Sequence, residues 1–344
     1  MLVLQFLRGL FAGGGDPCEV GTVAEWWPRE KTGLALGIHH SSYPWGAFLG
    51  GLIITGALLV VGDANWRMMF FIFPVIGIVI YTIFYKWSTP KRYAEFEANI
   101  KKVGMTPPLE LDGKEGNYVP PKGVLTRCLK NPNIVVTAIA SIFCHFAYIG
   151  FNFWMPLYLA FVAGYSFAAA ASLSIVFTIT GGLGQIICGH LADRFGTKRI
   201  LLICSLWLAV AFWLMQYISI SIGVLIGLQL FLGCCANAVY PVMYSFCAHS
   251  AEPGAVVTSN GILNTGLYLG ACVSTVIMGW LIELGGGLNS INGYLTGVYL
   301  MSGSMFIVFL MILIFTRETN GSRFGKDFSL VSLKSCNLEE DTKK

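Results

Sequence analysis

The sequence predicts an all-α membrane protein, and three observations indicate this fold class. Hydrophobic residues make up 55% of the 344 positions, and the mean hydropathy is +0.68. Only 12% of the residues are charged, which is about half the share found in soluble domains. The apolar residues gather in runs of roughly 20 or more, the length that a helix needs to cross a bilayer. The net charge of +4 is too small to indicate a nucleic-acid partner.

We expect about nine transmembrane helices, because a chain in lipid must satisfy its own backbone amides. The runs cover about residues 2–24, 33–61, 66–87, 132–160, 167–192, 199–219, 221–248, 255–284 and 289–316. The expected organisation is an N-terminal helical set over 1–87, a linker over 88–131, a C-terminal bundle over 132–316 and a tail over 317–344. Paired prolines interrupt the linker, and only the stretch from Lys91 to Lys102 could form a short surface helix.

Basic residues indicate the orientation of these helices. With nine spans the loops alternate between two sides, and one side holds almost all of the loop lysines and arginines, while the other holds only Arg67. Positively charged loops stay in the cytoplasm, so we expect the linker and the C-terminus inside and Met1 outside a cell membrane (inner or plasma). A start on the outer side indicates that further spans precede Met1. Three of them would place the N-terminus in the cytoplasm and give twelve spans, six on each side of the linker.

The loop between the fifth and sixth runs carries the most specific motif. It reads Gly189-His190-Leu191-Ala192-Asp193-Arg194-Phe195-Gly196-Thr197-Lys198-Arg199. Gly189 allows two helices to approach closely, and Asp193 can accept hydrogen bonds from the N-terminus of a neighbouring helix. The basic side chains can pair with acidic groups or with anionic lipid headgroups. A plain basic turn that anchors the orientation is the alternative, although such a turn needs neither Asp193 nor Gly196.

This loop resembles the cytoplasmic signature of the major facilitator superfamily, which lies between helices two and three and again between helices eight and nine. Its place here fits helices eight and nine if three helices precede Met1. The resemblance implies two helical bundles that rock about a central site, with the loop as a latch between inward-open and outward-open states. The latch residues would be Gly189, Asp193, Arg194, Gly196, Lys198 and Arg199. Without the missing helices, we expect the 344-residue form to transport poorly.

Three further segments resemble parts of the same family. The run Gln5-Phe6-Leu7-Arg8-Gly9-Leu10 is similar to the start of helix four, with Gln5 at the usual arginine position and Arg8 one turn along. The segment Glu25–Lys31 resembles the loop between helices four and five in organic-anion and sugar-acid symporters, and Asp63–Arg67 resembles the turn before helix six. The resemblance implies a proton-coupled symporter. Ala12 stands where those symporters often carry a glutamate.

Charged residues in the first span are candidates for substrate and proton binding, because charges in a membrane helix usually face a cavity or a partner. Arg8 would bind an anion beside a protonatable carboxylate, Asp16 or Glu19, and these two carboxylates share a helix face. The alternative places Arg8 at the membrane interface and ties the carboxylates to a loop. In the second span, His39 or His40 could carry a proton, or could simply join two helices.

Polar residues at helical spacing mark the remaining candidates. They are Tyr43 in the second span, His145, Tyr148 and Asn152 in the seventh family helix, Gln185 in the eighth, Asn237, Tyr240 and Tyr244 in the tenth, and Asn260, Asn264 and Tyr268 in the eleventh. Such stripes would line a central cavity for a polyhydroxylated or carboxylated solute. Hydrogen bonds between helices are the alternative reading of each residue.

Several chemistries lack support in the sequence. The ten cysteines form no CxxC pair, so neither a metal site nor a disulfide framework is indicated, and we expect the cysteines to act as small apolar fillers. No phosphate-binding loop or hydrolase motif is present, so we expect no cofactor and no enzyme activity. We predict a monomeric secondary transporter for a small organic solute, coupled to an ion gradient of protons. A membrane sensor or receptor without transport is the runner-up, and a membrane enzyme comes third.

Overall fold

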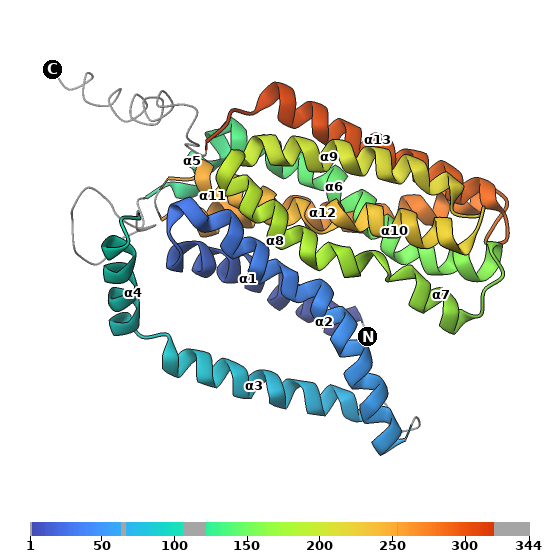
Figure 1. The fold of residues 1–344 in the computed structure, drawn as a ribbon, viewed down its shortest axis with the longest axis horizontal. Coiled ribbons are helices and arrows are strands. Elements are labelled where there is room, and N and C mark those ends of the chain that lie inside the picture. Colours follow the sequence, from blue (N-terminus) through green and yellow to red (C-terminus); the bar gives the residue numbers. More distant parts are fainter. Residues whose placement is uncertain (1, 63–66, 106–121, 253, 320–344) are drawn as a thin grey trace.

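The computed structural model describes residues 2–62, 67–105, 122–252 and 254–319, and within these ranges its regular structure is entirely helical (Figure 1). The first part contains α1 (Leu2–Trp26), η1 (Arg29–Lys31), α2 (Thr32–Val61), α3 (Met69–Trp87), α4 (Pro90–Lys102) and α5 (Val124–Lys130). The second part contains α6 (Pro132–Leu157), η3 (Tyr158–Val162), α7 (Phe167–Ser174), α8 (Phe177–Phe195), α9 (Thr197–Leu214), η4 (Met215–Tyr217), α10 (Ile222–Ala236), α11 (Val239–Ser250), α12 (Val256–Leu284) and α13 (Ile291–Phe315).

Six segments among the described residues are long and apolar enough to cross a membrane. They are Pro132–Val162, Ala169–Phe195, Thr197–Tyr217, Ile222–Ser250, Val256–Leu284 and Ile291–Phe315, and each matches one of the expected C-terminal spans. In α3, only the shorter apolar stretch Phe73–Trp87 was found, and α1 and α2 are long helices that are not among the six. A multi-pass all-α membrane protein is confirmed, whereas the expected count of nine spans is not.

Local sequence signals explain where several helices begin. A polar residue before the helix accepts a hydrogen bond from a backbone amide of the first turn, which satisfies a donor that has no partner inside the helix. These caps are Thr89 for α4, Asn131 for α6, Ser166 for α7, Ser221 for α10 and Ser290 for α13. Proline occupies the first position of both α4 and α6, where its missing N–H is not needed.

Two expected continuous spans are interrupted. The run over 221–248 divides into α10 and α11 because Pro241 has no N–H to donate to the carbonyl of Asn237, one helical turn earlier. Gln185 Nε2 donates to that carbonyl instead, at 3.2 Å. The run over 167–192 divides into α7 and α8, where the hydroxyls of Ser174 and Thr178 bond to carbonyls three residues earlier, a competition that bends helices.

By contrast, α1 is continuous across a segment that could interrupt a helix. Glycines and a proline surround Asp16, yet α1 continues through Pro17 to Trp26. It ends at Trp26, and α2 begins at Thr32, directly after the short turn η1. Asp16 is therefore held on a regular helix rather than at a break.

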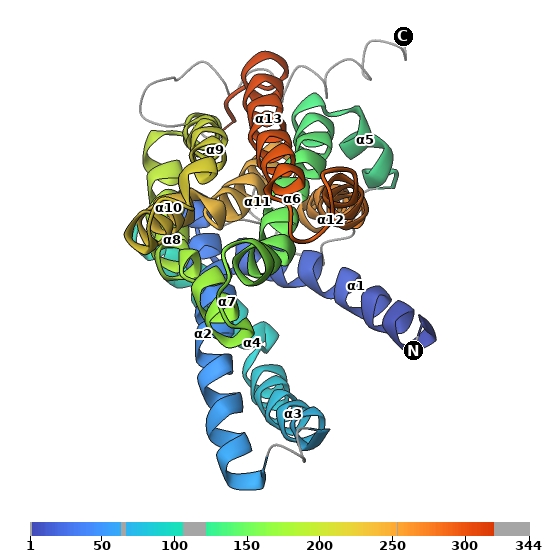
Figure 2. The same ribbon diagram turned by 90° about the vertical axis from the view of Figure 1, so that its right-hand side faces the viewer.

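Helices α6 and α8–α13 pack side by side in one bundle, and α1 and α2 contact that bundle at one end (Figures 1 and 2). This end also carries α4, α5 and the start of α6, and we call it the linker end. Toward the other end, α2 leads into α3, which runs apart from the bundle (Figure 2). The two parts therefore touch at the linker end and diverge away from it.

The surface of α3 supports a lipid environment. Large apolar side chains such as Phe70, Phe71, Ile78 and Tyr85 are exposed along it. A soluble monomer rarely leaves a contiguous apolar face of this extent in water. The bilayer is the natural partner for this face.

The linker contains the surface helix that the sequence predicts between Lys91 and Lys102. Trp26 at the end of α1 stacks on Trp87, with ring centroids 5.8 Å apart, and also contacts Tyr93 and Phe96 of α4. Burial, together with the nearby carboxylates of Glu97 and Glu25, raises the pKa of Tyr93 to about 12, so this phenol stays neutral. An apolar aromatic contact thus fixes α4 against the linker end of α1.

Close backbone packing inside the bundle yields a stability prediction for two glycines. A Cβ at Gly184 of α8 would collide with the carbonyl of Cys234, whereas Gly227 of α10 has open space. Alanine favours a helix over glycine by roughly 0.5–1 kcal/mol, so Gly227→Ala should raise the thermal midpoint slightly. Gly184→Ala should lower it, because overpacking costs about 1–3 kcal/mol. Thermal unfolding in detergent checks both, and equal shifts would contradict the packing.

Candidate functional site: a latch and a polar centre between two helical parts

The latch loop joins the two parts of the molecule through Asp193. Its Oδ1 accepts a hydrogen bond from the amide of Gly33 and its Oδ2 accepts one from the amide of Leu34, each at 2.7 Å. Both amides belong to the first turn of α2, where unpaired N–H groups and the helix dipole favour an anion. The carboxylate at the end of α8 therefore caps a helix of the other part.

Glycines allow this contact between α2 and α8. A Cβ at Gly189 would collide with the carbonyl of Gly33, and a Cβ at Gly37 would collide with the carbonyl of Gln185. Only residues without a side chain permit backbones to approach so closely. The small residue that the motif carries at position 189 thus sets the distance over which Asp193 reaches its partners.

The other end of the loop is held by Glu318, a residue that the sequence reasoning missed. Its carboxylate accepts hydrogen bonds from the Thr197 hydroxyl at 3.1 Å and from the Lys198 amide at 2.9 Å, and so caps α9. Gly196 precedes this cap with a φ of +103°, which favours glycine. The Lys198 ammonium donates to the carbonyls of Leu313 and Thr316 at the end of α13.

The remaining contacts at this end were also not anticipated. Lys198 was expected to pair with acidic groups or lipid; Glu318 is its electrostatic neighbour, and its ammonium also donates to carbonyls at the end of α13. Arg194 lies over the ring of Phe195, 5.4 Å from its centroid. His249 Nε2 lies 3.2 Å from the carbonyl of Arg29, which adds a second contact between the two parts. No pattern in the sequence marks His249 or Glu318, because each partner lies far away in the chain.

Removing the Glu318 carboxylate should destabilise the C-terminal bundle. We expect Glu318→Ala to lower the free energy of unfolding by about 0.5–2 kcal/mol, as for the loss of other helix caps. Glu318→Gln keeps one acceptor oxygen, so its free energy of unfolding should lie between those of Glu318→Ala and the parent protein. Thermal unfolding in detergent measures both, and an unchanged midpoint for Glu318→Ala would show that the cap contributes nothing.

Several of the predicted polar residues meet between α6, α8 and α11. His145 Nδ1 lies 2.9 Å from the Tyr240 hydroxyl, and the Tyr148 hydroxyl donates to Asn237 Oδ1 at 2.9 Å. The rings of His145 and Tyr148 are stacked with centroids 5.9 Å apart. The break before α11 places Asn237 here, and its carbonyl accepts hydrogen bonds from Gln185 Nε2 at 3.2 Å and from the Tyr240 amide.

A second group links the first part of the chain to α11 and α12. The Tyr268 hydroxyl donates to Asp16 Oδ2 at 3.3 Å, and Asn264 lies near this carboxyl group. The Tyr244 hydroxyl donates to Asn264 Oδ1 at 3.1 Å, and its ring packs edge-on against His40 at 4.9 Å. We call this group, together with the group around His145, Asn237 and Gln185, the polar centre, and it spans both parts.

The other candidates occupy varied positions. Glu19 accepts a hydrogen bond from Tyr81 of α3 at 3.2 Å, so it and Asp16 contact different helices despite their shared face. His39 is an electrostatic neighbour of Asp16. Tyr43 of α2 is exposed and is a neighbour of Tyr148 of α6. Asn152 donates to the backbone of its own helix. The side chain of Arg8 lies outside the described residues.

The polar centre retains hydrogen-bonding capacity. Within the described part of the chain, buried atoms without a protein partner include Asn237 Nδ2, Gln185 Oε1, Asn264 Nδ2 and both amide atoms of Asn260. A buried amide without a partner is unfavourable by about 1–3 kcal/mol. A groove between α1 and α12, lined by Gly13, Pro17, Asn264 and Tyr268 among others, opens beside Asp16. These atoms are suited to bind a polar solute or water.

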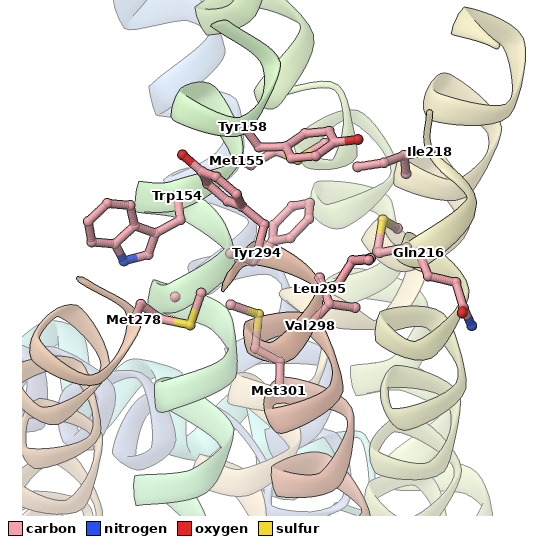
Figure 3. A pocket seen from close by; sticks show the side chains of 13 residues that line it. Trp154, Met155, Tyr158, Gln216, Ile218, Met278, Tyr294, Leu295, Val298 and Met301 are labelled. Carbon is pink, nitrogen blue, oxygen red and sulfur yellow. The ribbon is translucent and has the colours of Figure 1, made fainter. Parts of the chain in front are cut away.

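A different pocket lies near the opposite end of the C-terminal bundle (Figure 3). The rings of Trp154, Tyr158 and Tyr294 and the thioethers of Met278 and Met301 surround it. None of the predicted site residues lines this pocket. Its apolar character fits a hydrophobic chain rather than a polar solute, so we place the candidate site at the polar centre.

The fold and these contacts define a helical membrane protein in two parts that are joined by the Asp193 cap beside a polar centre. The family model of the Major Facilitator Superfamily matches residues 1–181 and 166–335. The chain therefore belongs to this family, as its latch loop predicted, and the expectation that it is not an enzyme is confirmed with it.

Curated relatives extend the comparison. The chain is 25% identical over 334 residues to "Putative glycerol-3-phosphate transporter 1" of Arabidopsis thaliana, an alignment that covers 90% of this chain and 62% of that protein. It is 27% identical over 328 residues to "Probable sulfoacetate transporter SauU" of Cupriavidus necator, with 89% and 72% covered. It is 20% identical over 341 residues to "Hexuronate transporter" of Bacillus subtilis, with 95% and 75% covered. The chain thus spans less than two thirds of the length of the first of these relatives.

A solved structure shows the same fold. The proton:xylose symporter XylE, bound to 6-bromo-6-deoxy-D-glucose, superposes with a TM-score of 0.62 over 87% of this chain and 67% of that one. The sequence identity is 16%, so this likeness supports the helical architecture alone. The fold class predicted from composition and apolar runs is therefore confirmed by an experimental neighbour.

Proposed function

We propose that this chain is a secondary active transporter of a small organic anion, of the sugar-phosphate or sugar-acid class. The observation that carries the proposal is the polar centre, in which Tyr268 of α12 donates to Asp16 of α1 and, close by, Tyr244 of α11 donates to Asn264 of α12. Solute sites of such transporters lie where two helical bundles meet. The relatives named for glycerol-3-phosphate, sulfoacetate and hexuronate share a small solute with an anionic group.

Each group in the centre has a proposed role. Tyr148, Asn237 and Tyr240 would bind solute hydroxyl groups, because each carries a donor or acceptor near atoms that lack partners. Gln185, Asn152, Asn260 and Asn264 would supply further amide contacts. Arg8 would bind the anionic group. Asp16 and Glu19, with His39, His40 and His145, are the proposed proton carriers, and Asp16 is the favoured one because it joins the two parts.

Alternating access is part of the proposal. The parts touch at the linker end and diverge away from it (Figure 2), and the Asp193 cap holds the closed end together. With the linker and the C-terminus in the cytoplasm, this arrangement corresponds to an outward-facing state. Loss of the cap would release the linker end and let the parts rock about the centre. We propose a monomer in the cell membrane, with protons as the coupling ions.

Ligand-induced stabilisation tests the solute class. A ligand that binds only the folded protein raises its thermal midpoint. We expect glycerol 3-phosphate, sulfoacetate or a hexuronate to stabilise the purified protein, and glycerol or xylose to have no effect at equal concentration. Asn237→Ala should lose the ligand-induced rise in the thermal midpoint. Asn292→Ala, which changes an exposed residue on the first turn of α13, should keep this rise. Equal stabilisation by neutral sugars would overturn the anion assignment.

A further inference from the structure

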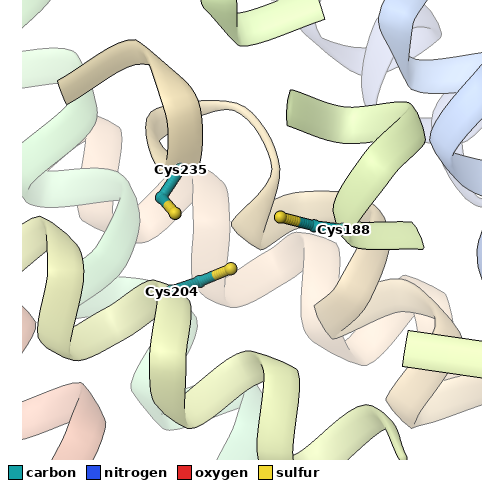
Figure 4. Close-up of side chains that lie close together, drawn as sticks. All are labelled: Cys188, Cys204 and Cys235. Carbon is teal, nitrogen blue, oxygen red and sulfur yellow. The ribbon is translucent and has the colours of Figure 1, made fainter. Parts of the chain in front are cut away.

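Three cysteines from three different helices meet inside the C-terminal bundle. Cys188 lies on α8, Cys204 on α9 and Cys235 on α10, and their sulfur atoms all lie within 4.8 Å of one another. The side chains point toward a common centre (Figure 4). Cys204 and Cys235 are buried, Cys188 is half-buried, and all three are free thiols.

Backbone packing explains the convergence. Gly184, one turn before Cys188, lies against the carbonyl of Cys234, so a side chain at that position would push α8 and α10 apart. Without one, the two helices approach closely, and Cys188 comes opposite Cys235. Cys204 completes the group from α9. The sequence holds no CxxC signal for it, because each sulfur comes from a separate helix.

We propose that Cys188, Cys204 and Cys235 form a binding site for a soft divalent cation larger than zinc, such as Cd²⁺ or Hg²⁺. Cysteine sulfur is the softest common protein ligand and selects such ions over Mg²⁺ or Ca²⁺. Three sulfurs around zinc, at about 2.3 Å each, would be roughly 4 Å apart. Separations of up to 4.8 Å suit the longer bonds of a larger ion with less movement.

The charge of the occupied site also fits its surroundings. An unbalanced charge in a low-dielectric interior is strongly unfavourable. A divalent cation with two thiolates and one neutral thiol is neutral overall. Two thiol protons pass to the buffer as two sulfur–metal bonds form, and the third sulfur donates a lone pair with its proton retained. No electrons are transferred.

The site would affect the helix that carries the latch. Cys188 lies between Gln185, which contacts the polar centre, and Asp193, which caps α2. A bound ion would tie this part of α8 to α9 and α10. The expected consequence is a C-terminal bundle that unfolds at a higher temperature when the ion is bound.

Titration of the purified, reduced protein with Cd²⁺ tests the proposal. We expect one tightly held ion per chain, a sulfur-to-metal absorption band in the ultraviolet and a higher thermal midpoint. Cys204→Ser and, as an independent variant, Cys235→Ala should weaken binding at least tenfold. The matched controls are Cys144→Ser, another buried cysteine, and the exposed Cys272→Ser, and both should bind as the parent does. Absence of a tight site, or equal binding after either cluster substitution, would overturn the proposal.

Discussion

Replacing Asp193 with asparagine is expected to slow transport about tenfold or more while leaving solute affinity within about twofold. The two carboxylate oxygens accept hydrogen bonds from the amides of Gly33 and Leu34. Hydrogen bonds to charged groups contribute about 1.5–3 kcal/mol each. Asparagine keeps one acceptor and loses the charge that interacts with the α2 dipole. The state closed at the linker end would become less populated, and a cycle needs both states.

Turnover and affinity must be measured separately in this variant. The initial rate of uptake reports cycling, and equilibrium binding reports the polar centre, which Asp193 does not touch. Glu283→Gln makes the same acid-to-amide change in an exposed residue near the end of α12 and should match the parent. An unchanged rate for Asp193→Asn would remove the latch role, and a parallel loss of affinity would place Asp193 in the solute site.

Asp16→Asn is expected to abolish uphill accumulation of the solute while exchange across the membrane continues. A carboxyl group that links α1 to Tyr268 of α12 can couple a proton to the contact between the two parts. Asparagine can still accept a hydrogen bond from Tyr268 but cannot release a proton. The exchange of internal for external solute needs no net proton movement, so it should survive.

The comparison with Glu19→Gln decides which carboxylate carries the proton. Glu19 lies one turn along α1 but contacts Tyr81 of α3, away from α12. We expect this variant to accumulate solute as the parent does. The measurement is solute accumulation under an imposed proton gradient, with solute exchange as the companion assay. Loss of accumulation in Glu19→Gln alone would reverse the assignment.

Much of the fold could be predicted from the sequence because the bilayer imposes long apolar helices. The six C-terminal spans, the surface helix after Lys91 and the family all follow from apolar runs, proline placement and one loop motif. The Asp193 contact was also foreseen, since a carboxylate in that motif suits a helix N-terminus. The orientation of the helices in the membrane stays a prediction, as do the domain boundaries and the roles of the site residues.

The features that were missed depend on contacts between distant residues. The break before α11 involves Pro241 and also Gln185, which lies on another helix and bonds to the Asn237 carbonyl at the break. Glu318 and His249 act on helices far away in the chain. The three-cysteine cluster requires the packing of α8, α9 and α10. Spacing along one helix predicted that Asp16 and Glu19 share a face, but it could not show that they bond to different helices.

Uptake of a labelled organic anion into proteoliposomes that carry this protein tests the central claim most directly. We predict slow but saturable uptake of glycerol 3-phosphate, sulfoacetate or a hexuronate above that of protein-free liposomes, with loss of uptake in Asn237→Ala and no competition from xylose. Binding of the anion without any uptake would contradict the account and would indicate a sensor built on the same fold.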